Sequence, residues 1–128
     1  MKITNIKIEL FNWEKDAWIT GVGTTFGGTK KLGVVSVETD EGVTGNAFLG
    51  SALVGADHFG PALIEFAKPM LIGRNPQDIG AIWWDLWKKN RSISTNAIGA
   101  IDICLWDING KIANQPIHRL LGNCKEKV

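Results

Sequence analysis

The sequence predicts an α+β fold, in which a three-stranded antiparallel meander is followed by a helical bundle. Up to position 49, segments of alternating polar and apolar residues dominate, whereas apolar residues at helical spacing dominate the remainder. Strands followed by helices, without alternation of the two, are typical of helices that cover one face of an antiparallel sheet. The length of 128 residues suits a single domain with a substantial core.

Three segments show the alternation expected of strands with one face in water: residues 3–11, 32–39 and 43–49. Asp40, Glu41 and Gly42 separate the last two, and the glycine can supply the positive φ that a short hairpin turn requires. We therefore expect the second and third strands to be antiparallel neighbours, with the first strand completing the meander.

Two connections are predicted to be loops. The stretch from Asn12 to Lys31 is several times longer than a hairpin needs and is rich in glycine and threonine. Connections of that length are usually functional or disordered. A second connection, residues 50–56, follows the third strand. We expect mobility to be highest at residues 21–28 and to have a weaker maximum in the second connection.

Prolines and capping residues mark the helix boundaries. Asp57 is placed to cap a first helix, which Pro69 is expected to end. Asn75 is a suitable N-cap for a second helix, and Pro76 suits its first position. A last short helix at residues 117–121 is expected to close at a glycine, position 122.

The central helix, residues 96–111, is the segment around which the rest of the chain is organised. Ser94 or Thr95 opens it, and its apolar stripe consists of Ala97, Ile98, Ile101, Cys104, Leu105, Ile108 and Ile112. Ile103 and Trp106 extend the apolar surface beyond that stripe. A helix that is apolar on most sides needs partners on more than one side, so we expect an exposed apolar patch and a homo-oligomer.

The chain has six tryptophans and no tyrosine. Trp83 and Trp87 are four residues apart on the apolar stripe of the second helix, so they are predicted to be core residues. Trp84 points elsewhere on the same helix and is the candidate for an interface.

The overall composition excludes several classes of protein. A formal charge of +1 offers no net field for DNA, RNA or an anionic membrane. The N-terminus alternates polar and apolar residues and lacks a signal-peptide core, and no apolar run reaches membrane-spanning length. Cys104 and Cys124 have neither metal-knuckle nor disulfide-framework spacing. We therefore expect a soluble, cytoplasmic protein that binds neither nucleic acid nor membrane.

Two acidic residues of the central helix suggest a metal or acid/base pair. Asp102 and Asp107 are five residues apart and diverge by about 140°, so they cannot converge on one ion. Each is instead expected to pair with a backbone group or a basic neighbour, since an unpaired buried carboxylate is costly.

The glycines of the first connection and the two histidines also have structural explanations. The glycine spacing fails the dinucleotide fingerprint because Phe26 occupies the third glycine position and a strand follows. His58 and His118 have no Cys or His at ligand spacing, so surface or capping roles are expected.

Three motifs together resemble a known family. They are TDEGVTGNAF across the hairpin, LIGRNPQDI, and AIGAIDICLWDINGKIANQPIHRLLG. The set is similar to the N-terminal capping domain of the enolase superfamily, specifically the mandelate racemase and muconate lactonizing group. The resemblance covers residues 3–122, and the last motif is the long and specific one.

The resemblance implies a capping domain at residues 1–122, with residues 123–128 at the start of a missing TIM barrel. A barrel of this kind needs about 200 or more residues. In this family a divalent metal, usually Mg²⁺, stabilises the enediolate formed when a base removes the proton α to a carboxylate. The metal ligands and the bases come from the barrel, so the resemblance implies no catalytic or metal-binding residue in this chain and no activity for the chain alone.

The resemblance also implies that two loops of the capping domain fold over the barrel mouth, exclude water and contact a small carboxylic-acid substrate. They correspond to the two connections described above. The residues expected to contact substrate in the intact enzyme are Trp18 or Phe26, as an apolar wall, and Thr20, Thr24 or Ser51, as hydroxyl contacts.

Several functions stay open. The first is a sugar-acid dehydratase, favoured because such enzymes are common in the family, with a racemase or cycloisomerase of the same superfamily as the alternative. A rival from another class is a stand-alone interaction module that binds a partner through its apolar face. The DNA downstream of Val128 discriminates them: a reading frame that continues into a barrel favours the enzyme, and a stop codon favours the module.

Overall fold

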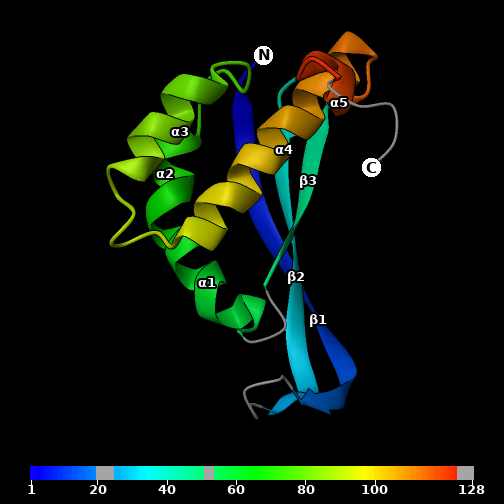
Figure 1. Ribbon diagram of the computed structural model, residues 1–128. Helices are drawn as coiled ribbons and strands as arrows, with labels where there is room; N and C mark the ends of the chain where they lie inside the picture. The colour runs from blue at the N-terminus through cyan, green and yellow to red at the C-terminus, as the bar shows by residue number, and fades with distance from the viewer. Residues whose placement is uncertain (20–24, 51–53, 124–128) are drawn as a thin grey trace.

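The computed structural model describes residues 1–19, 25–50 and 54–123, with backbone only at positions 15, 17, 18, 25 and 26. Three strands form one antiparallel sheet in the order β1-β2-β3. They are β1 (Ile3–Ile19), β2 (Thr25–Thr39) and β3 (Thr44–Leu49). Helices follow and cover one face of the sheet (Figure 1), so the predicted α+β meander is confirmed.

The turn between β2 and β3 forms as predicted. Gly42 has a φ of 79°, the left-handed region that favours glycine. The Thr39 hydroxyl donates a hydrogen bond of 2.7 Å to the Val43 carbonyl and closes the turn. The second and third strands are therefore antiparallel neighbours.

The predicted loop from Asn12 to Lys31 is wrong for most of its length. Asn12 pairs with Lys31, and the ladder continues to the pair of Ile19 and Thr25. Within this stretch the register shifts between Lys15 and Trp18. We call the antiparallel pair of β1 and β2 the β1–β2 ribbon. Its part beyond Phe11 is not covered by helices, so its side chains need not alternate between apolar and polar, and the sequence shows no strand pattern there. Its backbone groups still pair with each other.

The first helical run consists of α1 (Ala56–Ala62), a π-helical turn η1 (Leu63–Ala67) and α2 (Lys68–Leu71). Two expectations are corrected here. Gly55 is the N-cap and Asp57 lies in the first turn without a side-chain capping bond. Pro69 does not end the run, because it falls at the first positions of a new α-helical segment, where a missing N–H is tolerated.

The second predicted helix begins later than expected. α3 (Ile79–Trp87) is preceded by a turn in which the Asn75 carboxamide oxygen accepts a hydrogen bond of 3.1 Å from the Gln77 N–H. Asn75 therefore organises the turn and does not cap the helix. Local side-chain to backbone bonds of this kind compete with helix formation.

The central helix is α4 (Thr95–Ala113), followed by the short α5 (Ile117–Leu120). The Ser94 hydroxyl accepts from the Ala97 N–H at 3.2 Å, which confirms Ser94 as the cap. Asn114, with a φ of 49°, ends the helix in the left-handed conformation. Most of the predicted stripe is buried: Ala97, Ile98, Ile101, Cys104, Leu105 and Ile108.

The prediction that Trp83 and Trp87 are core residues is wrong. Both are 37% exposed, and their rings stack on each other at 5.2 Å between centroids. α3 contributes only Ile82 and Leu86 to the core. A helix that packs through a narrow stripe leaves the flanking side chains at the surface, and here the two indoles cover one another. Trp84 is 55% exposed.

The core lies between the sheet and the helices. It joins Ile3 and Ile6 of β1 to Val35 and Val37 of β2, and these four side chains are at most 1% exposed. α4 supplies most of its helical part. Within the described ranges, no helix is long and apolar enough to cross a membrane.

Candidate functional site

The residues predicted to contact substrate belong to the far end of the β1–β2 ribbon and to the connection after β3. Trp18 and Phe26 are direct partners across the ribbon, so the structure brings their backbones together. The placement of their side chains is not described. Thr20, Thr24 and Ser51 lie outside the described residues.

A polar hollow of about 280 Å³ lies where the ribbon meets the beginning of α1. It is lined by Asn12, Thr29, Lys30, Lys31, Gly55 and Asp57. Lys31 and Asp57 approach each other to 3.9 Å, and both side chains are about half exposed. Two lysines beside amide and hydroxyl groups suit an anionic ligand such as a carboxylate.

Sequence reasoning did not select these lysines. The available signal was the adjacent pair Lys30 and Lys31 at the end of a glycine-rich stretch. The prediction of a loop for that stretch gives these lysines no fixed position, whereas the ladder places both on a strand. Only the packing of the ribbon against α1 shows that they line a hollow.

An apolar hollow of about 470 Å³ lies on the helical side of the ribbon, lined by Ile8, Leu10, Asp57, Gly60, Pro61 and Ile64. Leu10 is 47% exposed and Ile64 is 39% exposed. The ribbon therefore carries a polar hollow and an apolar hollow that share Asp57.

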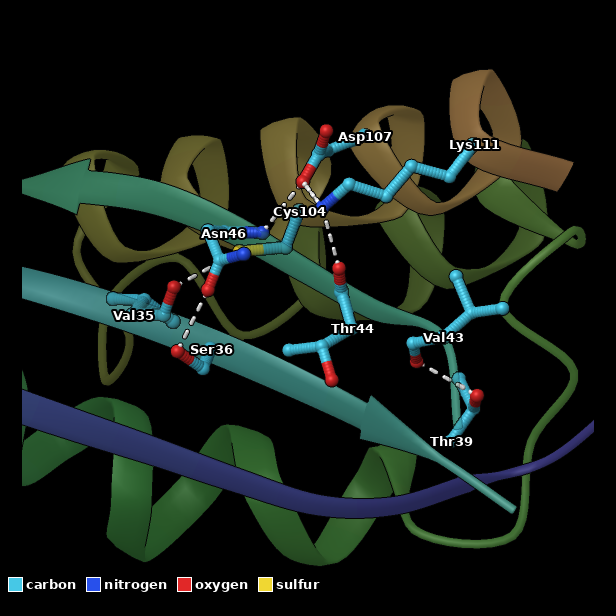
Figure 2. Close-up of polar contacts among 9 residues, drawn as sticks. All are labelled: Val35, Ser36, Thr39, Val43, Thr44, Asn46, Cys104, Asp107 and Lys111. Atoms are coloured by element: carbon cyan, nitrogen blue, oxygen red, sulfur yellow. Dashed lines mark hydrogen bonds and ion pairs between the residues drawn. The ribbon is translucent and has the colours of Figure 1, made fainter. Parts of the chain in front are cut away.

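A network of polar contacts fastens α4 to β3 (Figure 2). The Asp107 carboxylate accepts from the backbone N–H of Asn46 at 2.9 Å and from the Lys111 ammonium at 2.7 Å. Lys111 also donates to the Thr44 carbonyl at 2.6 Å. The Ser36 hydroxyl of β2 donates to the Asn46 side-chain oxygen at 2.9 Å, which extends the network to a second strand.

The expected pairing with a backbone group or a basic neighbour is confirmed for Asp107 and is not seen for Asp102 among the described residues. Asp107 has a backbone partner and a basic partner. Asp102 has no hydrogen-bond or ion-pair partner in the described part of the chain, and burial raises the pKa of its carboxyl. It is only partly buried, so water can solvate it in place of a protein partner.

Cys104 is a structural thiol in the same region. Its sulfur contacts the Val35 carbonyl at 3.5 Å, and the side chain is fully buried. Burial raises the pKa of this thiol to about 12, so it is not a nucleophile at neutral pH.

Residues 1–19, 25–50 and 54–123 contain no group of three or more His, Cys, Asp or Glu side chains that could hold a metal ion. The described residues therefore do not fit a Mg²⁺ site, which needs several oxygen ligands.

Residues 7–122 match the family model described as mandelate racemase / muconate lactonizing enzyme, N-terminal domain. Since the match covers most of the chain, this chain belongs to that family, which forms the N-terminal domain of enolase-superfamily proteins. The resemblance inferred from the three sequence motifs is thus confirmed.

Two curated relatives are dehydratases or belong to a dehydratase family. A D-galactonate dehydratase family member of Musicola paradisiaca is 35% identical and aligns with 100% of this chain and 28% of its own length. The D-mannonate dehydratase of a Sphingomonas species is 36% identical over 73% of this chain and 24% of its own length. The chain spans less than a third of the length of either relative.

Solved structures show the same fold. An enolase-superfamily member from Polaromonas is 30% identical with a TM-score of 0.80, over 95% of this chain and 33% of that one. The 3,6-anhydro-D-galactonate cycloisomerase of Zobellia galactanivorans is 26% identical with a TM-score of 0.75, over 95% and 32%. The D-glucarate dehydratase of Agrobacterium tumefaciens, solved with magnesium, is 25% identical with a TM-score of 0.73, over 95% and 33%.

Proposed function

We propose that this chain is the N-terminal capping domain of a Mg²⁺-dependent sugar-acid dehydratase of the enolase superfamily. The observation that carries the proposal is the alignment of the whole chain with 28% of a D-galactonate dehydratase family member. The similarity to a cycloisomerase keeps that reaction, or racemisation, as the alternative within the same superfamily.

The reaction would begin with removal of the proton α to the substrate carboxylate, and a Mg²⁺ ion held by other parts of a longer protein would supply stabilisation of the negative charge on that carboxylate. In a dehydratase, departure of the β-hydroxyl as water follows. The metal ligands and the acid/base residues are assigned to the rest of a longer protein, a TIM barrel beyond residue 122. No chemical step is assigned to a residue of this chain, and the chain alone is expected to be inactive.

The role of this domain is to close the site and to select the substrate. The ribbon end is a two-stranded extension of the sheet past the helices (Figure 1), which supports a role as a covering element. Trp18 and Phe26, partners across it, are proposed to form an apolar wall over the substrate. Thr20, Thr24 and Ser51 are proposed as hydroxyl contacts. Exclusion of water strengthens the electrostatic interactions within such a site.

The polar hollow at the base of the ribbon supports an acidic substrate. Two cations, Lys30 and Lys31, and one carboxylate, Asp57, line this hollow, so the charged side chains of its lining sum to +1, which favours an anion held nearby. The exposed apolar side chains of the ribbon and of α4 support association with the barrel and with further copies of the protein.

The proposed lid is tested by the double substitution W18A/F26A in the full-length protein. We expect kcat/KM to fall about tenfold and the preference among sugar acids to change, while thermal stability changes little. The matched control is W87A/F66A, which removes one exposed tryptophan and one exposed phenylalanine from the helices. This control is expected to leave kcat/KM unchanged.

Unaltered substrate preference together with a loss of several kcal/mol of stability in W18A/F26A would show that the two aromatics are packing residues. The lid assignment would then be wrong. Failure of the full-length protein to turn over any sugar acid, or a stop codon directly after Val128, would contradict the enzymatic assignment itself.

A further inference from the structure

β3 is the last strand in the sheet order, so among the described residues one of its edges has no neighbouring strand. Unpaired edge groups are costly when buried and invite unwanted pairing when exposed. At two positions α4 supplies side chains to this edge. Lys111 donates to the Thr44 carbonyl at 2.6 Å, and Asp107 accepts from the Asn46 N–H at 2.9 Å.

The spacing of these contacts follows from the periods of the two elements. Backbone N–H and C=O groups that face the same edge of a strand recur every two residues, about 6.7 Å apart. Side chains on the same side of a helix recur about every four residues, about 6 Å apart. Thr44 and Asn46 are therefore matched by Lys111 and Asp107, one helical turn apart. The next pair in the series is Phe48 and Ile103.

Ile103 cannot continue the series because its side chain has no polar atom. It is 53% exposed, Phe48 is 73% exposed, and both line an open apolar hollow of about 360 Å³. Polar side chains of α4 thus contact the edge of β3 at Thr44 and Asn46 (Figure 2). Among the described residues, no such polar contact is made at Phe48, although this part of β3 stays paired with β2.

The C-terminal end of β3 leads directly to the place where the β1–β2 ribbon meets the beginning of α1, which we call the base of the ribbon. A Cβ atom on Gly50, which has a φ of 113°, would lie 3.1 Å from the Ala56 nitrogen and 3.3 Å from the Lys31 carbonyl oxygen. Gly50 therefore sits tightly between the beginning of α1 and the strand that carries the lysines of the polar hollow. A shift of β3 along α4 would move this junction.

We propose that Asp107 and Lys111 are positioning residues, which fix β3 against α4 and thereby set the geometry of the polar hollow at the base of the ribbon. The inference rests on the proposed function, because it assumes that this hollow faces the acidic substrate. Neither residue touches substrate. Their effect is on substrate affinity and passes through β3 and Gly50.

The test has two parts, and the first uses the 128-residue chain alone. Hydrogen exchange at the Asn46 amide is measured in the parent, D107A, D107N and D85A. Asp85 is the matched control, since its carboxylate, like that of Asp107, accepts two hydrogen bonds. Its donors are Arg74 at 2.9 Å and Lys88 at 3.1 Å, and among the described residues neither donor belongs to the sheet. We expect faster exchange at Asn46 in D107A only, because the carboxamide oxygen of D107N still accepts the bond.

The second part uses the full-length protein with the sugar acid that it turns over best. D107A and K111M are expected to raise KM about five- to tenfold while kcat changes less than twofold. D107N and K111R are expected to keep KM much closer to the parent value than D107A and K111M do. D85A is expected to leave KM unchanged.

Each result decides a different point. Faster exchange at Asn46 in D107A with an unaltered KM overturns the positioning role and leaves a purely structural contact. A rise of KM in D85A as large as in D107A overturns it as well, because general destabilisation would then explain both. Absence of sugar-acid turnover in the parent contradicts the proposed function, and the exchange experiment still reports whether the contact holds β3.

Discussion

The two halves of the β1–β2 ribbon have the same backbone pairing and opposite surroundings. Near the N-terminus of β1, Ile6 and its partner Val37 are both 0% exposed beneath the helices. Toward the far end, Phe11 is 50% exposed and Ile19 is 71% exposed, although the ladder continues without interruption at Phe11. Hydrogen bonding therefore gives both halves their strand geometry, whereas only one half contributes to the core.

The largest predicted effect concerns the half that packs against α4. A methyl group on Gly45 would overlap the Cys104 carbonyl oxygen and approach the Ile108 side chain to 2.8 Å. Since helix backbone cannot yield locally, we expect G45A to lower the free energy of unfolding by more than about 3 kcal/mol. Urea denaturation followed by circular dichroism measures this.

Gly99 provides the control, because a Cβ there has no heavy atom of another part of the chain within 4 Å. G99A on α4 is expected to raise stability by about 0.5–1 kcal/mol through helix propensity. Equal stability of G45A and the parent would show that β3 and α4 do not pack as closely as described.

The second prediction compares the two halves of the ribbon directly. I6A removes a fully buried side chain and is expected to cost about 2–5 kcal/mol. L10A, on the same strand with 47% exposure, is expected to cost about 1 kcal/mol or less. Similar losses for I6A and L10A would mean that something covers the far half, for example a second copy of the chain.

The smallest predicted effect is electrostatic. Lys7, by its hydrogen bond, and Asn5, by a second one, lower the pKa of the Glu38 carboxyl below its ordinary value of 4.5. A carboxyl with a lowered folded-state pKa stabilises the fold above its ordinary pKa, and this contribution is lost as pH falls through the folded-state value. Stability from Glu38 should therefore be present at pH 7 and disappear at acidic pH.

The measurement is the melting temperature of the parent and E38Q between pH 7 and pH 2. We expect a small difference at neutral pH that vanishes on acidification. E65Q is the control, since Glu65 is an exposed residue of η1 with no ion pair in the described part of the chain. A difference between parent and E38Q that persists at pH 2 would show that the side-chain amide itself is unfavourable there, without a role for charge.

Local sequence signals accounted for those parts of the fold that depend on neighbours along the chain. Ser94 caps α4 because a hydroxyl before an apolar helix can bind the first free N–H groups. Gly42 forms the turn because only a residue that tolerates positive φ fits there. The stripe of α4 was readable because helical periodicity directs its side chains to one side whatever the partner is. The lid residues named from the family resemblance remain a prediction.

Only the tertiary structure decided which apolar residues are buried and where the strands end. Ile82 and Trp83 are both large and mainly apolar, yet α3 packs on the rest of the molecule through a narrow contact that buries Ile82 and leaves Trp83 at the surface. The ribbon beyond Phe11 forms because each strand finds the other as a partner, a pairing that no local pattern encodes. The hydrogen bond from the Asn46 N–H to the Asp107 carboxylate joins residues 61 positions apart, so its two ends become neighbours only when α4 packs against the outer edge of β3.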